Sequence, residues 1–353
     1  MYSSLRILLY TTLTVLPVLV SGQLNDLAQR RGKLYFGTET ETWEFNDTTY
    51  LSHLNNVREF GALVPGNSMK WEVIQPGRYE WNFTLADQIV DLAEHNGQHM
   101  RCHNLVWHEQ LPGWLVNGTW GKENLTAVMI DHVVREVTHY KGKCYAWDVV
   151  NEVLNDDPNN GTLRSDMWLD IIGPEYIAIA FEHAARADPH AKLYYNEYDI
   201  EFKGPKHDGA MKVVKMIQDA GVRIDGIGFE SHFTPSTAPG LQEQMDCMKD
   251  FTDLGLELAV TELDVRILLP DSPEELEQQE TVYVDTVEAC MNTEKCVGMT
   301  VWDFWDQNSW IGPLTWDLYY NGYGEADLYF ANWTRKPAYT GIESALKHRP
   351  SHW

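Results

Sequence analysis

The hydrophobic positions of this chain fall into two alternating patterns. Short apolar runs, rich in β-branched and aromatic residues, are each followed by a longer stretch in which apolar residues recur with helical spacing. The short runs lie near Leu34–Thr38, Gly61–Val64, Met100–Trp107, Cys144–Asn151, Leu193–Asn196, Ile224–Glu230, Leu256–Leu263 and Val297–Trp302. Eight strand–helix units of roughly 40 residues each predict a single (β/α)8 TIM barrel rather than a doubly wound sheet.

The helical stretches carry the signals expected at helix ends. In one of them four apolar residues share a face, and Gly97 stands where a C-terminal cap belongs. Those four residues are Leu85, Ile89, Leu92 and Ala93. Farther along, Ser272 is followed by Pro273 and then by Glu275, which is a capping pattern for a helix start. Pro174 likewise predicts the start of a helix over Glu175–Arg186.

The first residues are predicted to be a targeting signal. Arg6 precedes the apolar run Ile7–Val20, and Ser21 and Gly22 follow before the chain turns polar. This order is typical of a secretory signal peptide cleaved after Gly22. An uncleaved anchor is the alternative, but the run is shorter than the roughly 20 residues that span a bilayer. We therefore expect residues 1–22 to be signal peptide, residues 23–353 to form the barrel, and the mature protein to be secreted.

The strong negative charge of the chain argues against nucleic acids and anionic membranes as partners. The formal net charge is -25 over 353 residues, and no basic run is present that would release counterions from nucleic acid or bind an anionic membrane surface. We expect a monomer without a nucleic-acid or membrane partner. The sequence also contains 14 tryptophans. Exposed indoles stack on flat apolar faces, and sugar rings have such faces.

Cysteines and glycosylation motifs fit an oxidising secretory route. Cys290 and Cys296 flank a short loop between a helical pattern and a strand, so we predict a disulfide there. A second bridge between Cys102 and Cys144, which would leave Cys247 free, is left open by the sequence. Sequons occur at Asn46, Asn82, Asn117, Asn124, Asn160 and Asn332. No cysteine or histidine spacing indicates a metal site, and we expect none.

Two strand-like runs each deliver a glutamate. The run Trp147–Glu152 is apolar until it ends in an amide and a carboxylate, and the run Glu257–Val265 contains Glu262 in an otherwise apolar setting. Two such glutamates suggest an enzyme in which one carboxylic acid protonates a leaving group and one carboxylate attacks. For either motif alone, a capped structural acid is an equally good interpretation.

A barrel would bring further polar residues to the same place. Active sites of this fold lie at the C-terminal ends of the strands, so the side chains that end each run should converge. They are Asn67, Lys70, His103, Trp107, His108, Gln110, Asn151, Glu152, Asn196, Tyr198, Glu230, His232, Glu262, Asp264, Trp302 and Trp310. Amides, histidines and a lysine can hydrogen-bond hydroxyls while indoles pack on ring faces, so the set predicts a sugar site.

Taken in order, these motifs resemble those of the glycoside hydrolase family 10 endo-β-1,4-xylanases of fungal type. The matching segments are Gly32–Thr38, Asn67–Trp71, His103–Pro112, Trp147–Glu152, Asp225–Gly228, Thr261–Asp264, Thr300–Trp302 and Lys336–Tyr339. They run through the whole chain after the signal peptide. The resemblance implies an enzyme that cleaves xylan and xylo-oligosaccharides at internal β-1,4 bonds without a cofactor.

The resemblance also assigns chemical roles. It implies retention of configuration by double displacement, with Glu152 as general acid/base and Glu262 as nucleophile. His232, hydrogen-bonded to Glu262 with Asp264 behind it, would keep that carboxylate ionised. Asn151 would contact the 2-hydroxyl of the sugar being cleaved.

The remaining residues of the implied substrate site shape sugar subsites. Those next to the scissile bond are Lys70, His103, Trp107, Trp302 and Trp310, and those one unit farther are Asn67 and Gln110. Tyr198, Glu230 and His232 complete the substrate-binding set. A simpler interpretation makes His103 and Trp107 fillers of the barrel. Trp71, Trp114 and Trp316 are as consistent with packing as with binding.

The chain departs from the family pattern at four positions. Gly66 replaces a glutamate expected to bind the sugar two units from the cleavage point, and Glu230 replaces a glutamine. Gln75 and Asp303 stand where glutamate and glycine are common. Two rival functions remain: a β-1,4-glucanase would use the same two glutamates, and a non-catalytic carbohydrate-binding protein would be expected to have lost one of them.

Overall fold

The computed structural model describes residues 23–312 and 322–348, and it shows a closed barrel of parallel strands. The barrel strands are β1 (Tyr35–Thr40), β2 (Ala62–Pro65), β3 (His99–Cys102), β4 (Ala146–Asn151), β5 (Lys192–Glu197), β6 (Gly226–Phe229), β8 (Glu257–Val265) and β10 (Cys296–Val301). They pair in chain order, and β10 pairs with both β8 and β1, which closes the ring. The predicted (β/α)8 barrel is confirmed.

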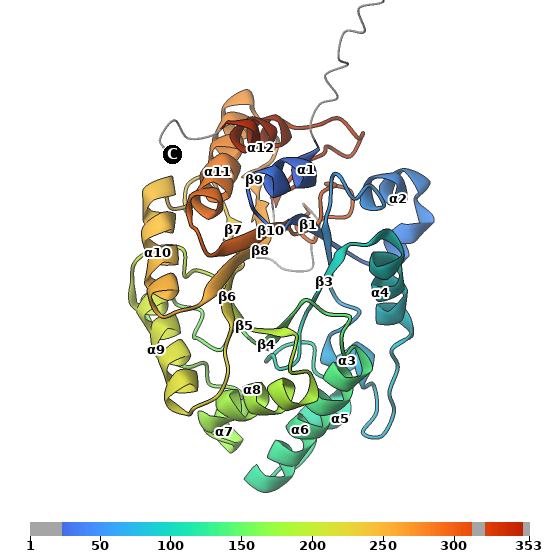
Figure 1. The fold of residues 1–353 in the computed structure, drawn as a ribbon, viewed down its shortest axis with the longest axis vertical. Helices are drawn as coiled ribbons and strands as arrows, with labels where there is room; N and C mark the ends of the chain where they lie inside the picture. Colours follow the sequence, from blue (N-terminus) through green and yellow to red (C-terminus); the bar gives the residue numbers. More distant parts are fainter. Residues whose placement is uncertain (1–22, 313–321, 349–353) are drawn as a thin grey trace, which may run out of the picture.

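Helices surround the strands on all sides in Figure 1. The described helical segments are α1 (Leu24–Arg30), η1 (Thr42–Asn46), α2 (Thr48–Leu54), α3 (Trp71–Ile74), α4 (Thr84–Asn96), α5 (Gly113–Val116), α6 (Lys122–His139), α7 (Met167–Ile171), α8 (Glu175–Ala187), α9 (Pro205–Asp219), α10 (Leu241–Asp253), α11 (Pro273–Asn292) and α12 (Pro337–Lys347). Near the two ends of the described chain, α1 packs against α12. Among the described residues, every helix is too short or too polar to cross a membrane.

Three short strands lie outside the ring. β7 (His232–Phe233) follows β6 and pairs with the end of β8, opposite Asp264 and Val265. β9 (Ile267–Leu268) and β11 (Tyr323–Gly324) form a small antiparallel pair. β7 therefore extends the barrel wall beyond β6 at the end where the polar residues gather.

The strand predicted over Met100–Trp107 is too long, because β3 ends at Cys102. The chain then leaves the regular ladder, although the amides of Leu105 and Val106 still donate to the carbonyl oxygens of Asp148 and Val149. Both side chains are fully buried. The apolar run therefore reflects burial rather than continued strand geometry.

Most of the predicted helix signals are confirmed. Gly97 follows α4 with φ 74°, a left-handed conformation that favours glycine. The Ser272 hydroxyl accepts a hydrogen bond from the amide of Glu275 at 3.2 Å at the start of α11. The predicted inner face of α4 is wrong at one residue, because Leu85 is 39% exposed. The buried residues of α4 are Ala86, Ile89, Val90 and Ala93, and Leu92 is half-buried.

Below the C-terminal ends of the strands, the barrel interior contains charged as well as apolar side chains. The guanidinium of Arg101 pairs with the carboxylate of Asp148, and both side chains are about 1% exposed. That guanidinium also lies 4.4 Å from the ring centroid of Tyr194. A buried ion pair that lost one partner would leave an uncompensated charge, so the two residues depend on each other.

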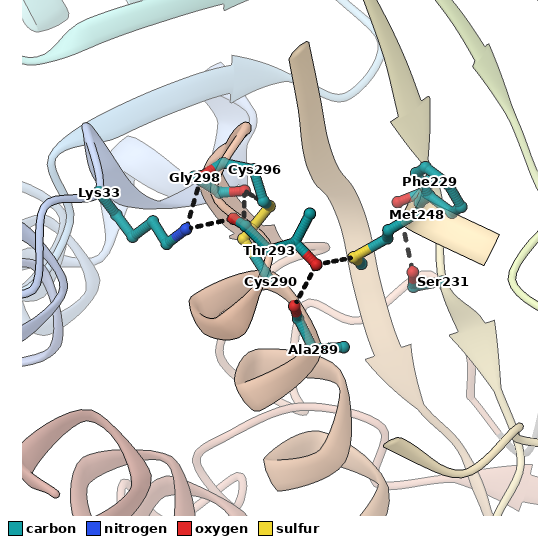
Figure 2. Close-up of a disulfide and its surroundings, with 9 residues drawn as sticks. All are labelled: Lys33, Phe229, Ser231, Met248, Ala289, Cys290, Thr293, Cys296 and Gly298. Atoms are coloured by element: carbon teal, nitrogen blue, oxygen red, sulfur yellow. Dashed lines mark hydrogen bonds between the residues drawn. A yellow bond between two sulfur atoms is a disulfide. The ribbon is translucent and has the colours of Figure 1, made fainter. Parts of the chain in front are cut away.

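Two disulfides join neighbouring strand–helix units. The predicted Cys290–Cys296 bridge is present and links α11 to β10, as Figure 2 shows. Lys33 donates from its ammonium group to the carbonyl oxygens of Thr293 and Cys296 at 2.9 and 2.8 Å, which fixes the loop between the two cysteines. The structure also decides the open alternative, because Cys102 and Cys144 are bonded and Cys247 is a buried free thiol.

The two bridges should differ in their effect on stability. Closing a loop restricts the unfolded chain, and the separations are 42 and 6 residues. We expect Cys102→Ser/Cys144→Ser to lower the free energy of unfolding by about 4 kcal/mol and Cys290→Ser/Cys296→Ser by about 2 kcal/mol. Denaturant unfolding of the oxidised proteins measures both, with Cys247→Ala as the thiol control. A larger loss for the short loop would contradict the loop-entropy argument.

Candidate active site

Neighbouring strands deliver polar side chains to one end of the barrel. The register places Asn151 opposite Asn196, and Asn196 opposite Gly228, on strands β4, β5 and β6. Glu152 follows directly with φ 52°, a backbone conformation that is costly outside glycine and is often kept at functional sites. Glu262 lies within β8 and is 5% exposed. The convergence predicted from the sequence is therefore present at the C-terminal end of the strands.

Two amides connect the two glutamates. The Asn151 side-chain N–H donates to Oε1 of Glu152 at 3.1 Å. The side-chain nitrogen of Asn196 lies 2.9 Å from Oδ1 of Asn151 and 2.8 Å from Oε1 of Glu262. The amide nitrogen faces Glu262 because an ionised carboxylate can only accept a hydrogen bond, and the Thr261 hydroxyl then donates to the Asn196 amide oxygen at 2.7 Å.

The position opposite Asn196 must be a glycine. A Cβ atom on Gly228 would lie 2.0 Å from Oδ1 of Asn196 and 2.8 Å from the Thr261 methyl group. Neither neighbour can withdraw without breaking the hydrogen bond between them. The sequence singled out Asn196 only as one of many polar strand ends, and its link to both glutamates depends on this register.

A histidine and an aspartate lie beside Glu262 in the arrangement that the family resemblance implies. Nε2 of His232 lies 3.3 Å from Oε2 of Glu262, and Nδ1 lies 2.8 Å from Oδ2 of Asp264. The indole N–H of Trp310 donates to the same Asp264 oxygen at 2.7 Å. Burial alone would lower the pKa of His232, but the charges of Asp264 and Glu262 raise that pKa to about 10.

The two glutamates have pKa values displaced in opposite directions. Burial would raise the pKa of Glu262, but His103, His232 and Lys70 together hold it below its usual value. For Glu152 burial dominates and raises the pKa, although His108 and Trp107 oppose the change. One carboxyl group therefore favours the ionised form and the other the protonated form.

His103 does more than fill the barrel. Its Nδ1 atom lies 3.1 Å from Oδ2 of Asp148 and 3.8 Å from Oε1 of Glu262. The Trp302 ring meets the His103 ring edge-on at a centroid distance of 5.4 Å. Because Asp148 is itself paired with Arg101, the polar interior of the barrel supports the floor of the site.

Lys70 and Trp107 lie on one side of the site together with two amides. The Lys70 ammonium lies 4.7 Å from the ring centroid of Trp107 and 3.3 Å from Oδ1 of Asn67. Gln110 donates to the same Asn67 oxygen at 3.1 Å. Burial lowers the pKa of Lys70, while Glu262 and Glu152 oppose that change. The predicted subsite residues on this side are therefore brought together.

Tyr198 joins the site through residues that the sequence did not single out. Arg164 donates to the backbone oxygen of Glu152 at 3.1 Å and to the Tyr198 hydroxyl at 3.1 Å. Asp156 pairs with both Arg164 and the Tyr198 hydroxyl. The loop after β4 carried no strand-end signal, because these contacts are made across two loops.

Some of the tryptophans lie at the site, and others are packed in the protein core. Trp310 is 42% exposed, and its ring meets the His232 ring edge-on at a centroid distance of 5.1 Å, whereas Trp302 is largely buried. Trp71 stacks on His132 at 3.7 Å and is a packing residue. Trp114 is half-buried and donates to the backbone of Gln75. Trp316 and the predicted signal peptide over residues 1–22 lie outside the described residues.

Comparison with known proteins decides the family. A family model described as glycosyl hydrolase family 10 matches residues 23–345. The chain belongs to glycosyl hydrolase family 10. Endo-1,4-beta-xylanase D of Talaromyces funiculosus is 47% identical over 325 residues, which cover 92% of this chain and 78% of that protein. Endo-1,4-beta-xylanase A of Phanerodontia chrysosporium is 46% identical over 323 residues, covering 91% and 76%.

Solved structures agree with this assignment. The GH10 xylanase from Bispora sp. MEY-1, crystallised with xylobiose, matches with a TM-score of 0.87 and 42% identity over 92% of this chain and 99% of that chain. The Penicillium canescens endo-1,4-beta-xylanase XylE matches with a TM-score of 0.88 and 39% identity, over 94% and 99%. The family predicted from the motifs is therefore confirmed.

The departures from the family pattern have different structural settings. Glu230 is buried beside Glu262, and burial together with the charges of Glu262 and Glu152 raises its pKa well above the usual value. Gln75 accepts from the Trp71 indole at 3.0 Å and so belongs to the core of this family 10 barrel. Asp303 is buried after β10 and accepts from the amide of Phe304 at 2.5 Å.

Two groups among the described residues have ligand atoms close enough to hold a cation. One comprises Glu230, His232 and Glu262, and the other comprises Glu39, Glu44 and Asp303, with the ligand atoms of each group within 4.8 Å of one another. In the first group the ring of His232 lies between the carboxylates of Asp264 and Glu262, which favour its protonated form, and a protonated ring nitrogen cannot bind a metal.

Asp264→Asn tests the support of Glu262. Without the Asp264 charge the pKa of His232 should fall from about 10 toward the ordinary value near 6.5. The proton on His232 stabilises the folded protein fully below pH about 6.5, and this contribution is lost as the pH rises through 10. NMR titration of the ring measures the pKa, with Asp250→Asn beside His207 as control. An unmoved titration would show that Asp264 does not sustain the charge.

Proposed function

We propose that this family 10 protein is an endo-β-1,4-xylanase that cleaves xylan with retention of configuration. The single observation that carries the proposal is the linked carboxyl pair. Glu152 and Glu262 are joined through the Asn151 and Asn196 amides, and their pKa values are displaced in opposite directions. A double displacement needs one ionised nucleophile and one protonated acid in the same cleft.

In the first step Glu262 attacks the anomeric carbon of the bound sugar. The bond between that carbon and the glycosidic oxygen breaks, its electron pair goes to the oxygen, and Glu152 transfers its proton there. The shortened chain leaves with the new hydroxyl, and the sugar remains bound to Glu262 as an ester. His232 keeps Glu262 ionised until the attack, because its positive charge stabilises the carboxylate.

In the second step water replaces the departed chain. Esterification removes the negative charge of Glu262, which is one of the charges that raise the pKa of Glu152. Glu152 is now ionised and accepts a proton from water as the water oxygen attacks the anomeric carbon. The ester bond breaks and returns its electron pair to Glu262. Two inversions at the same carbon give net retention.

Xylan is the substrate that the cleft and its relatives favour. Asn67, Lys70 and Gln110 offer hydrogen-bonding groups along one wall, while Trp310 presents an exposed ring above His232. The relatives from Talaromyces and Phanerodontia are named endo-1,4-beta-xylanases, and the Bispora family member was crystallised with xylobiose. In this proposal Asn151 turns from Glu152 toward the 2-hydroxyl of the sugar during cleavage.

The protein is proposed to act outside the cell as a monomer. The predicted signal peptide, two disulfides and a set of accessible sequons support secretion. The sequon asparagines with exposed side chains are Asn46, Asn82, Asn117, Asn124 and Asn332, and Asn160 is half-buried. No cofactor, nucleic acid or membrane enters the proposed reaction.

Removal of the nucleophile tests both mechanism and substrate. We expect the wild type to release reducing sugars from glucuronoxylan in preference to carboxymethylcellulose, and Glu262→Ala to be inactive. Azide fits the space left by the carboxylate, so it should partly restore cleavage and give a glycosyl azide of inverted configuration. A preference for cellulose would support the rival glucanase function, and full activity in the variant would exclude Glu262 as nucleophile.

The pH profile tests the assignment of acid and nucleophile. Because the pKa of Glu262 lies below the usual 4.5 and that of Glu152 above it, kcat/KM should form a bell whose limbs lie on either side of that value. Glu152→Gln should remove the alkaline limb and reduce kcat/KM on xylan by about 10²- to 10⁴-fold. A variant that kept the alkaline limb would assign that limb to another group.

A further inference from the structure

Glu39 occupies the space where a side chain on position 66 would begin. A Cβ atom built on Gly66 would lie 1.8 Å from Oε1 of Glu39 and 2.7 Å from its Cδ atom. The backbone of Gly66 does not have a positive φ, so the missing side chain is explained by the occupied space and not by backbone conformation. The carboxyl group thus reaches from β1 across to the end of β2.

The same turn is held firmly by a second acid. Glu41 accepts hydrogen bonds from the amides of Asn67 and Ser68 and from the Ser68 hydroxyl. This anchoring fixes the backbone of Asn67, whose side chain is exposed beside Lys70. Glu39 therefore lies against a turn of fixed shape that carries two of the predicted sugar ligands.

Unlike Glu41, Glu39 does not hold this turn through hydrogen bonds of its side chain. Among the described residues its carboxyl oxygens form no hydrogen bond, although the side chain is only 7% exposed. Burial, followed by the charges of Glu44 and Glu41, raises its pKa well above the usual value, and Lys70 opposes the change. A largely buried carboxyl group without a hydrogen bond destabilises a fold, and we take its presence here as the sign of a role in the bound state.

We propose that the Glu39 carboxyl group is a specificity-determining ligand for a hydroxyl of the xylosyl unit bound beside Asn67 and Lys70, one unit beyond the sugar attacked by Glu262. The inference rests on the proposed xylanase function and deepens it. In the protonated form the group both donates and accepts, which suits a sugar hydroxyl. Glu39 on β1 would thus provide the carboxyl group that is missing at Gly66.

A cation held by Glu39, Glu44 and Asp303 is the competing occupant. The geometry favours the sugar ligand, because Glu44 and one oxygen of Asp303 already accept hydrogen bonds from the protein. Oε2 of Glu44 accepts from the Thr40 hydroxyl at 2.9 Å and from the amide of Glu41 at 2.6 Å. Oδ1 of Asp303 accepts from two backbone amides of the segment that follows it.

The experiment compares two synthetic substrates that differ by one sugar. An aryl β-xyloside reaches only the sugar site at Glu262, whereas an aryl β-xylobioside also fills the next site. Glu39→Ala should lower kcat/KM for the xylobioside about tenfold more than for the xyloside, the size of one lost hydrogen bond to a partly buried group. Glu39→Gln, which still donates and accepts, should recover most of that ratio.

A second variant moves the carboxyl group from position 39 to position 66 and so tests the position of the ligand directly. Gly66→Glu in the Glu39→Ala background returns a carboxyl group to the same space from β2, and the Glu39→Ala change removes the 1.8 Å conflict. This double variant should restore the preference for the xylobioside. Glu257→Gln, which removes a carboxylate at the start of β8, should leave the preference unchanged.

Each outcome separates this inference from the proposed function. Wild-type cleavage of xylan with equal losses on both substrates in Glu39→Ala would overturn the role of Glu39 alone, whereas absence of xylan cleavage in the wild type would overturn the proposed function. A lower melting temperature in Glu39→Ala would also count against the inference, since removal of a buried unpaired acid should not destabilise the fold. Stabilisation of the wild type by Ca²⁺, abolished in Glu39→Ala, would establish the cation instead.

Discussion

The hydrogen bond from Thr261 to the Asn196 amide oxygen is the constraint on which the site depends. It holds the amide oxygen in place while the amide nitrogen faces Asn151 and Glu262, and Asn151 in turn donates to Glu152. The bond exists only because the register aligns three strands and because Gly228 leaves room for it. A site built on strands of a closed barrel keeps such distances, since no strand can shift without breaking the ladder on both sides.

Two sets of charged residues surround Glu262, the carboxylate that this amide contacts. His232 and Asp264 support Glu262 from one side, and His103 approaches it from below with Asp148 and Arg101 beneath. The positive groups keep the nucleophile ionised in a place where burial alone would protonate it. Removal of any one of these charged residues leaves its partner buried without an opposite charge. We therefore expect the effects of mutating them to be non-additive. Glu152 lies outside this positive group and responds to burial instead.

The chain also shows how a local departure is compensated in space. Gly66 looks from the sequence like the loss of a sugar ligand, yet a carboxyl group occupies the same volume from the neighbouring strand. Likewise Glu230 looks like an added charge, but its burial favours the neutral form, which hydrogen-bonds much as an amide does. A substitution therefore has to be judged by what fills the volume and by the charge that the surroundings permit.

The sequence by itself determined the barrel, the order of its strands and the delivery of Glu152 and Glu262 by two of those strands, because short apolar runs, helical patterns and short motifs are local properties of the chain. It could not determine the true end of β3, the inner face of α4 at Leu85, the Cys102–Cys144 bridge, or the roles of Asn196, Arg164 and Glu39. Those features join segments that lie far apart along the chain. Only the closed barrel fixes the distances between such segments, because strand register and the volume left by neighbouring side chains are properties of the tertiary structure.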